Sequence, residues 1–253
     1  MQRLFFKGIE VSLIAPGKDL STSTGIQLIK HQIKVTQEIS ILSQLEHENI
    51  VRYLGTDKDD SNLYVFLELL PKGSLASLYR MYRLYDTQVS TYTKQILSGL
   101  HYLHSLNVVH RDIRCDNILV GVNDSVKLAD FGFAKVITQL NDIKSTKGSP
   151  RWMAPEVVRK NNNGYGRAAD IWSLGCTVLE MLTGQFPYYE LEGVQALFQI
   201  GRGKLPTIPE DLSEDAKDFI HKCLQVNPSD RPTAAELSDH PFLKTASPLS
   251  DVY

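Results

Sequence analysis

The stretch HRDIRCDN at residues 110–117 is followed by DFG at residues 130–132. Between them, two short apolar runs at residues 118–120 and 126–129 flank a polar turn at residues 123–124, a pattern that predicts a β-hairpin. The spacing supplies one carboxylate to orient an attacking hydroxyl, then an amide and a second carboxylate to hold Mg²⁺ against the phosphates of a nucleotide. The stretch therefore predicts a magnesium-nucleotide site built from a loop and a hairpin.

A third motif, APE at residues 154–156, follows at a compatible distance. The three motifs in this order resemble those of eukaryotic protein kinases, and the resemblance covers nearly all of the chain. Three stretches look like plant MAP kinase kinase kinases of the MEKK type: GSPRWMAPE at 148–156, ADIWSLGC at 169–176 and IGRG at 200–203. The resemblance implies a serine/threonine protein kinase that transfers the γ-phosphate of ATP to a MAP kinase kinase in a signalling cascade.

The resemblance also implies an α+β fold with two lobes. The small N-lobe would hold a reduced antiparallel sheet and one helix, and the large C-lobe would be mainly helical. We expect one catalytic domain, with the N-lobe at residues 1–70, the C-lobe at residues 71–243 and a tail at residues 244–253.

Hydrophobic patterns agree with this division. Residues 4–13 and 63–70 are rich in apolar and aromatic side chains and end at proline-containing turns, which predicts strands. Between them, Ser23 and Thr24 are candidate N-caps for a helix that reaches Leu42. In the second lobe, a stripe of apolar residues with helical spacing predicts a long helix that ends just before the HRD motif. The stripe comprises Val89, Tyr92, Ile96, Leu100 and Leu103.

The 253-residue chain, 42% apolar, can bury a sizeable core, and the family resemblance implies one catalytic unit, because a kinase catalytic domain is about this long. Its 27 basic and 29 acidic residues nearly balance, so we expect neither nucleic-acid nor membrane binding. Cys115, Cys176 and Cys223 lack the spacing of a disulfide framework or a zinc site. No apolar run approaches the roughly 20 residues of a membrane span. We therefore expect a cytoplasmic protein, with the nucleus as an alternative compartment.

The resemblance assigns catalytic roles to four residues of the two central motifs. Asp112 takes the position of the general base that accepts the proton of a substrate hydroxyl. Arg114 stands where serine/threonine kinases usually carry a lysine that contacts the transferred phosphoryl group, and it keeps the charge while presenting a planar fork. Asn117 and Asp130 take the positions of the Mg²⁺ ligands. The implied cofactors are ATP and Mg²⁺.

The resemblance also predicts contacts to the nucleotide base. Leu119 would form the floor under the adenine, and the backbone of Glu68 and Leu70, in the linker between the lobes, would bond its edge. Asp130 would act on the phosphates through the metal ion.

Regulatory residues follow from the same resemblance. Arg111, beside the catalytic position, can pair with a phosphate on the activation segment, for which Ser145 and Thr146 are our first candidates. Such a phosphate implies an upstream kinase, and a scaffold protein is a further expected partner. Two structural contacts are also predicted: an ion pair between Glu156 and Arg231, and support of the HRD loop by Asp170.

The family pattern breaks near the N-terminus. A glycine-rich GxGxxGxV loop and a lysine on the third strand are expected, yet residues 5–13 resemble that third strand and carry Ile9 at the lysine position. Glu38, the usual partner of that lysine, remains and is counted with the regulatory residues. Lys7, about 6.6 Å back along the strand, is a candidate substitute. The sequence thus leaves three alternatives open: an active kinase, a partial chain of one, or a catalytically impaired kinase-like module that binds cascade partners.

Overall fold

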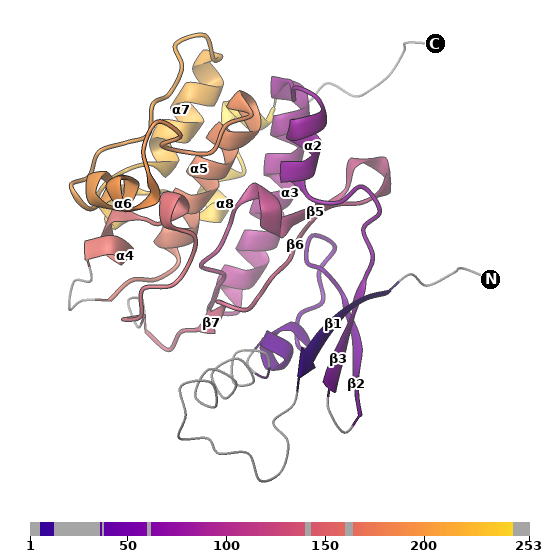
Figure 1. Ribbon diagram of the computed structural model, residues 1–253. Helices are drawn as coiled ribbons and strands as arrows, with labels where there is room; N and C mark the ends of the chain where they lie inside the picture. The colour runs from indigo at the N-terminus through magenta and orange to yellow at the C-terminus, as the bar shows by residue number, and fades with distance from the viewer. Residues whose placement is uncertain are drawn as a thin grey trace, which may run out of the picture.

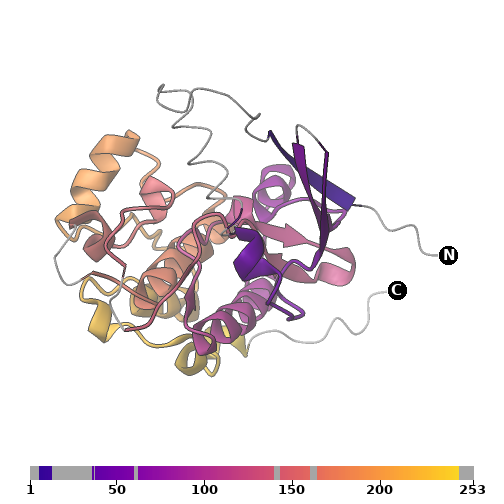
Figure 2. The ribbon, with the colours of Figure 1, turned by 90° about the horizontal axis from the view of Figure 1, so that it is seen from below.

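The computed structural model describes residues 6–12, 36, 38–59, 62–139, 143–159 and 164–244. These residues form a small lobe with a β-sheet and a larger helical lobe, which lie side by side in Figures 1 and 2. The expected α+β, two-lobed fold class is therefore confirmed. The predicted division at residue 70 and the tail from residue 244 stay predictions, because residues 245–253 lie outside the described part.

The small lobe is built on one antiparallel sheet. Its strands, in spatial order, are β1 (Phe6–Ser12), β3 (Asn62–Glu68) and β2 (Tyr53–Lys58). The strands expected from residues 4–13 and 63–70 are thus present, with shorter bounds. The backbone register sets Ile9 opposite Val65 and Lys7 opposite Leu67.

Strand β2 does not follow from the sequence pattern. Its pairing with β3 shifts register between Tyr53 and Gly55, and Gly55 has a φ of 151° that suits glycine. Residues 38–42 are helical, but most of the helix expected to end at Leu42, with its N-caps at Ser23 and Thr24, lies outside the described residues.

The large lobe is mainly helical (Figure 1). Its described helices are α2 (Leu75–Met81), α3 (Asp86–Ser105), α4 (Pro155–Arg159), α5 (Ala168–Thr183), α6 (Gly193–Gly201), α7 (Glu214–Cys223) and α8 (Ala234–Leu237). The apolar stripe predicted for the long helix is buried on α3, which confirms that helix. Helix α5 is buried on nearly all sides, so it forms the centre of the lobe. No helix in the described ranges combines the length and apolarity needed to cross a membrane.

Two short pairs of strands lie beside α3. The hairpin of β5 (Ile118–Val120) and β6 (Val126–Leu128) confirms the one predicted around residues 123–124, where Asn123 and Asp124 both have positive φ angles. The second pair is β4 (Val108–Val109) with β7 (Lys135–Val136). Strand β6 also ties the segment that leads into β2 to the large lobe. Backbone bonds join Val51 N to Leu128 O at 2.9 Å and Leu128 N to Asn49 O at 2.8 Å.

Candidate active site

Asp170, in the first turn of α5, holds the backbone of the HRD loop. Its buried carboxylate accepts the backbone N–H of His110 at 2.9 Å and that of Arg111 at 2.8 Å. It also bonds His104 Nε2 at 2.9 Å. Burial alone would raise the pKa of Asp170, but these hydrogen bonds, the one with His104 foremost, lower it below its usual value. The predicted support of the loop by Asp170 is confirmed, and the loop is held against the core.

The Asp112 carboxylate is held from two directions. Its Oδ2 accepts Asn117 Nδ2 at 2.7 Å, and its Oδ1 accepts the backbone N–H of Ser149 at 2.9 Å. Asn117 Nδ2 also donates to the Asp112 carbonyl at 2.9 Å. Only 6% of Asp112 is exposed, so the carboxylate has one orientation and little competition from water.

Arg114 connects the loop with the activation segment, which is the stretch from Asp130 to Glu156. Its NH1 donates to Ser149 Oγ at 3.2 Å, and its NH2 pairs with Asp116. The guanidinium lies 5.0 Å from the ring centre of Trp152. The guanidinium of Arg114 thus donates from two nitrogens and stacks one face on an aromatic ring at the same time. The single ammonium group of a lysine could not make these three contacts together.

Asn117 and Asp130 are brought to the same end of the β5–β6 hairpin, because Ala129 N donates to Asn117 O at 2.9 Å. The amide nitrogen of Asn117 is occupied by Asp112, so its oxygen is the end left for a cation. Asp130 is exposed, and its Oδ1 accepts Gly132 N at 3.2 Å. Two hard oxygen donors fit Mg²⁺, which commonly takes one or two protein ligands and completes its shell with phosphates and water.

Leu119 lies on β5, which is hydrogen-bonded to the segment that follows Leu70. Backbone bonds join Lys72 N to Val120 O at 3.1 Å and Val120 N to Gly73 O at 2.8 Å, and half-buried Leu119 pairs with Ser74. The Leu70 N–H has no hydrogen bond to any described residue, and it is therefore available to a ligand.

The Glu68 side chain is already engaged. Its Oε1 accepts Arg52 N at 2.6 Å and pairs with Lys127 Nζ at 2.7 Å. These bonds occupy the side chain, and any contact of Glu68 with a base would come from its backbone, as the sequence predicts.

Arg111 contacts one of the two predicted phosphorylation positions. Its NH1 donates to Ser145 Oγ at 3.1 Å and to the Tyr165 hydroxyl at 3.5 Å, and its Nε donates to Phe133 O. Tyr165 in turn donates to the Ser145 carbonyl at 2.8 Å. Thr146 is exposed and is not among these contacts. Geometry therefore favours Ser145 over Thr146 as the partner of Arg111.

The sequence did not reveal a network centred on Glu180, on the C-terminal half of α5. Glu180 is 1% exposed, and its carboxylate accepts the Tyr79 hydroxyl at 2.9 Å, Trp152 Nε1 at 3.0 Å and Cys115 N at 3.4 Å. Burial raises the pKa of Glu180. Three segments, namely α2, the catalytic loop and the activation segment, thereby meet on one side chain. The only sequence signal is an acidic residue within the otherwise apolar run of residues 178–182.

The predicted Glu156–Arg231 pair is confirmed. It is bidentate, with both N–O distances at 2.7 Å, and both side chains are buried. At the N-terminal end, Glu38 lies half-buried in the helical residues 38–42, while Ile9 and Lys7 are placed on β1 by backbone register only.

Comparison with known proteins identifies the family. The protein kinase domain model matches residues 18–243. The chain is 60% identical over 245 residues to mitogen-activated protein kinase kinase kinase 1 of Arabidopsis thaliana, covering 96% of this chain and 39% of that protein. Identity to mitogen-activated protein kinase kinase kinase 9 of the same plant is 58% over 247 residues, covering 97% and 31%. For mitogen-activated protein kinase kinase kinase 1b of Physcomitrium patens it is 53% over 247 residues, covering 98% and 31%.

The chain thus spans well under half the length of these relatives, and the match lies in the part that carries the site described above. Three observations point to the same family: the order of the HRD, DFG and APE motifs, the two-lobed fold and the match to the protein kinase domain model. The chain belongs to the protein kinase family.

Proposed function

We propose that this chain is a serine/threonine kinase that transfers the γ-phosphate of ATP to a hydroxyl of a MAP kinase kinase. The observation that carries the proposal is the position of the Asp112 carboxylate, fixed by Asn117 on one side and by the Ser149 N–H on the other. A carboxylate held at the junction of catalytic loop and activation segment is suited to orient an incoming hydroxyl and accept its proton.

The other side chains of the site would hold the phosphates. Arg114, fixed by Ser149 and Trp152, directs a permanent positive charge to the same junction, where charge develops on the transferred group. Asn117 and Asp130 would hold Mg²⁺, which when bound neutralises phosphate charge. Leu119 and the backbone of Glu68 and Leu70 would hold the base. The serine/threonine preference rests on the GSP stretch at residues 148–150, which the family resemblance associates with that class.

The substrate and partners are inferred from relatives. Proteins named mitogen-activated protein kinase kinase kinase match almost the whole chain at 53% to 60% identity, so a MAP kinase kinase is the proposed substrate. An upstream kinase acting on Ser145, or a scaffold, is the proposed regulator, and the cytoplasm, or the nucleus as an alternative, is the proposed compartment. The Arg111–Ser145 contact supports Ser145, since a phosphate there would meet a guanidinium already in reach.

A second candidate function is a kinase-like module that binds cascade partners without efficient transfer. It is favoured by Ile9, which the family resemblance aligns with the phosphate-binding lysine. Without the lysine ammonium, the activation free energy of phosphate transfer would rise by roughly 3 to 5 kcal/mol.

Thermal shift with ATP, with and without Mg²⁺, separates the two functions. A kinase requires a magnesium-dependent rise in melting temperature, whereas a binding module does not. We expect a small rise for the wild-type chain and a larger one for Ile9→Lys, because the added ammonium would meet the phosphates. No rise in either protein would exclude the kinase function and favour the module.

A further inference from the structure

A pocket on the large lobe shares no lining residue with the proposed nucleotide site. It has a volume of about 870 Å³, a size that suits a small organic ligand. Its walls come from the C-terminal end of α3, the end of α4, the start of α5 and the segment that joins α7 to α8. Segments that are far apart in the sequence therefore meet around one cavity.

Two of the three arginines that line the pocket carry a charge that no described carboxylate neutralises. Arg231 forms the bidentate pair with Glu156, which is the only acidic residue among the described lining residues. Arg159 and Arg167 form no ion pair within the described part of the chain. The pocket therefore presents an excess of positive charge.

The guanidinium groups of Arg159 and Arg167 are only partly used by the protein. Arg159 Nε donates to the Gly201 carbonyl at 2.7 Å, and Arg167 NH2 donates to Asn107 Oδ1. The buried Nε of Arg167 has no acceptor among the described residues. Guanidinium groups with terminal nitrogens to spare bind the oxygens of a phosphate or carboxylate, and the charge of such an anion also offsets the cost of the buried donor.

Part of the lining is apolar. Ile171 and Ala234 are buried, and Val226, Pro228 and Pro232 are half-buried. An anion that also carries a compact apolar group would cover these side chains and gain affinity from their burial. The lining thus favours an organic anion over a bare inorganic one.

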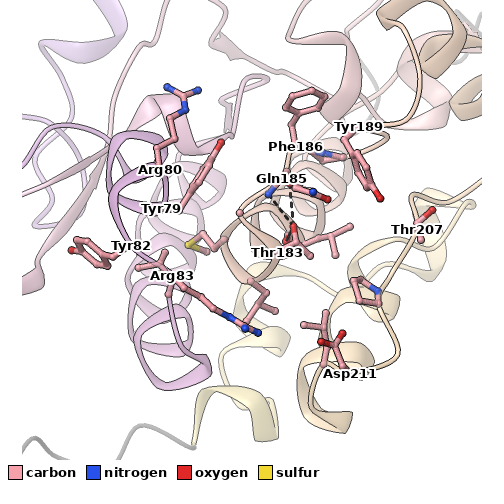
Figure 3. A pocket seen from close by; sticks show the side chains of 18 of the residues that line it. Tyr79, Arg80, Tyr82, Arg83, Thr183, Gln185, Phe186, Tyr189, Thr207 and Asp211 are labelled. Carbon is pink, nitrogen blue, oxygen red and sulfur yellow. Dashed lines mark hydrogen bonds between the residues drawn. The ribbon is translucent and has the colours of Figure 1, made fainter.

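The side chains around the pocket favour a small molecule over a protein segment. Exposed aromatic side chains are enriched in protein interfaces, and Tyr82, Phe186 and Tyr189 are exposed along the groove beside α2 in Figure 3. In the described ranges, none of the exposed large apolar side chains lines the pocket with Arg159 and Arg167. A small ligand therefore fits this pocket better than a protein segment does.

One wall of the pocket is joined to the HRD loop. His104 lines the pocket, and its Nε2 lies 2.9 Å from Asp170 Oδ2. The Asp170 carboxylate in turn accepts the backbone N–H groups of His110 and Arg111. A single buried carboxylate therefore connects the pocket with the loop that carries Asp112.

Two other lining residues are joined to the activation segment. Tyr165 forms an antiparallel backbone bridge with Ile143, with N–O distances of 3.2 Å and 3.0 Å. Arg167 donates to the side chain of Asn107, whose carbonyl accepts Ile137 N at 2.9 Å. Displacement of the activation segment would break both contacts and change the shape of the pocket. A ligand that fits the pocket in its present shape therefore favours the ordered segment.

We propose that this pocket is a binding site for a small organic anion, a phosphate or carboxylate joined to a compact apolar group, and that its occupancy stabilises the ordered activation segment. Arg159 and Arg167 bind the anionic group, and the apolar lining residues cover the rest of the ligand. The inference goes beyond the proposed kinase function and does not require it, because binding and ordering are both measured without phosphate transfer.

Titration of the isotope-labelled full chain with phenyl phosphate, followed by NMR, tests the binding. Inorganic phosphate and benzyl alcohol supply the anionic and the apolar part separately, and each should bind roughly tenfold more weakly. Arg159→Glu should weaken the binding of phenyl phosphate about tenfold or more. Ala235→Trp, which places a bulky side chain at the pocket wall and keeps the charge, should do the same. Arg83→Glu, the matched charge reversal at an exposed arginine outside the pocket, should leave the affinity unchanged.

Four results would overturn the site as proposed. Equal affinity of the wild type, Arg159→Glu and Ala235→Trp would place the probe elsewhere. Benzyl alcohol that binds as tightly as phenyl phosphate would show that the arginines recognise no anion. Inorganic phosphate that binds as tightly would show that the apolar lining contributes nothing. A Gly-Gly-phosphotyrosine-Gly-Gly peptide that binds much more tightly than phenyl phosphate would assign the pocket to a phosphorylated protein instead of a small molecule.

Amide hydrogen exchange of the same samples tests the effect on the activation segment. Saturating phenyl phosphate should slow the exchange of the Ile137 and Ile143 N–H groups several-fold, because their acceptors belong to the contacts that join the segment to the pocket. It should not slow that of Leu128, whose N–H donates to Asn49 outside the pocket. Arg159→Glu should abolish the difference. Binding without slower exchange at Ile137 and Ile143, or equal slowing at Leu128, would contradict stabilisation of the segment.

Discussion

The Asp112 carboxylate accepts the backbone N–H of Ser149 at 2.9 Å, although the two residues are 37 positions apart. The same serine uses its hydroxyl to accept Arg114 NH1 at 3.2 Å. One residue of the activation segment thus fixes both the carboxylate proposed as base and the cation proposed to meet the phosphate. A conformational change in the activation segment would therefore move both the Asp112 carboxylate and the Arg114 guanidinium.

Replacing Ser149 with alanine separates these two contacts. Ser149→Ala keeps the N–H that holds Asp112 and removes the hydroxyl that holds Arg114. Loss of one hydrogen bond to a charged group costs about 1.5 kcal/mol, so kcat should fall roughly tenfold while the KM for ATP stays near its original value. Steady-state kinetics provides the measurement. Ser105→Ala, an exposed serine on α3, is the control and should keep full activity. A changed KM for ATP with unchanged kcat would show that Arg114 does not act on the transfer step.

The Asp130 carboxylate is proposed to hold the metal and not to accept a proton. Asp130→Asn should therefore remove the magnesium-dependent part of the thermal shift with ATP, because an amide oxygen attracts Mg²⁺ less than a carboxylate does. Asp112→Asn should keep that shift, since Asp112 is not a proposed metal ligand. If Asp130→Asn retains the full magnesium-dependent shift, the metal is held elsewhere.

The Asp170 carboxylate has a pKa below its ordinary value of 3.8 in the folded chain, so it favours folding when ionised. Its contribution is fully present above pH 3.8 and is lost as the pH falls through the lower folded-state pKa. Asp170→Asn should therefore lower the free energy of unfolding near neutral pH by roughly 3 to 5 kcal/mol, the cost typical of breaking a buried charged network. The difference from wild type should shrink in acid. Urea unfolding at a series of pH values measures it, and a difference that grows in acid would contradict the assignment.

The buried Glu156–Arg231 pair offers a matched comparison with a surface pair. Glu156→Gln leaves Arg231 buried without its charge partner and should cost about 3 to 5 kcal/mol in unfolding free energy. Glu214→Gln makes the same chemical change in a pair with Lys217, where Glu214 is 91% exposed, and should have little measurable effect. Equal effects of the two substitutions in urea unfolding would show that burial does not set the strength of the first pair.

Much of the large lobe was predictable because its signals are local. The apolar stripe on α3 repeats with helical spacing, and the two short apolar runs that flank the polar turn at Asn123 are typical of a hairpin. The role of Asp170 and the Glu156–Arg231 ion pair were predicted from family motifs. These motifs assign contacts between residues that are far apart in the sequence. The catalytic and metal-binding candidates come from the same motifs, and the fold brings them together at the end of the hairpin.

Other contacts were not predictable from the residues. The bond to Asp112 comes from the backbone N–H of Ser149, and every residue except proline has such a group. Glu180 lies in an apolar run of α5, where the sequence shows an acidic residue but not the three donors that come from distant segments. Strand β2 has a glycine at its register shift and a polar end, so no alternation marks it. Each of these features depends on how distant segments pack.

The most direct test of the account is phosphate transfer itself. It is measured as the incorporation of labelled phosphate from ATP into serine or threonine of a MAP kinase kinase whose own catalytic site has been inactivated by mutation. The account predicts transfer by the wild-type chain and a loss of at least about a hundredfold in Asp112→Asn, with the melting temperature and the magnesium-dependent ATP shift retained. Transfer at equal rates by both proteins, or no transfer by a wild-type chain that binds magnesium and ATP, would contradict it.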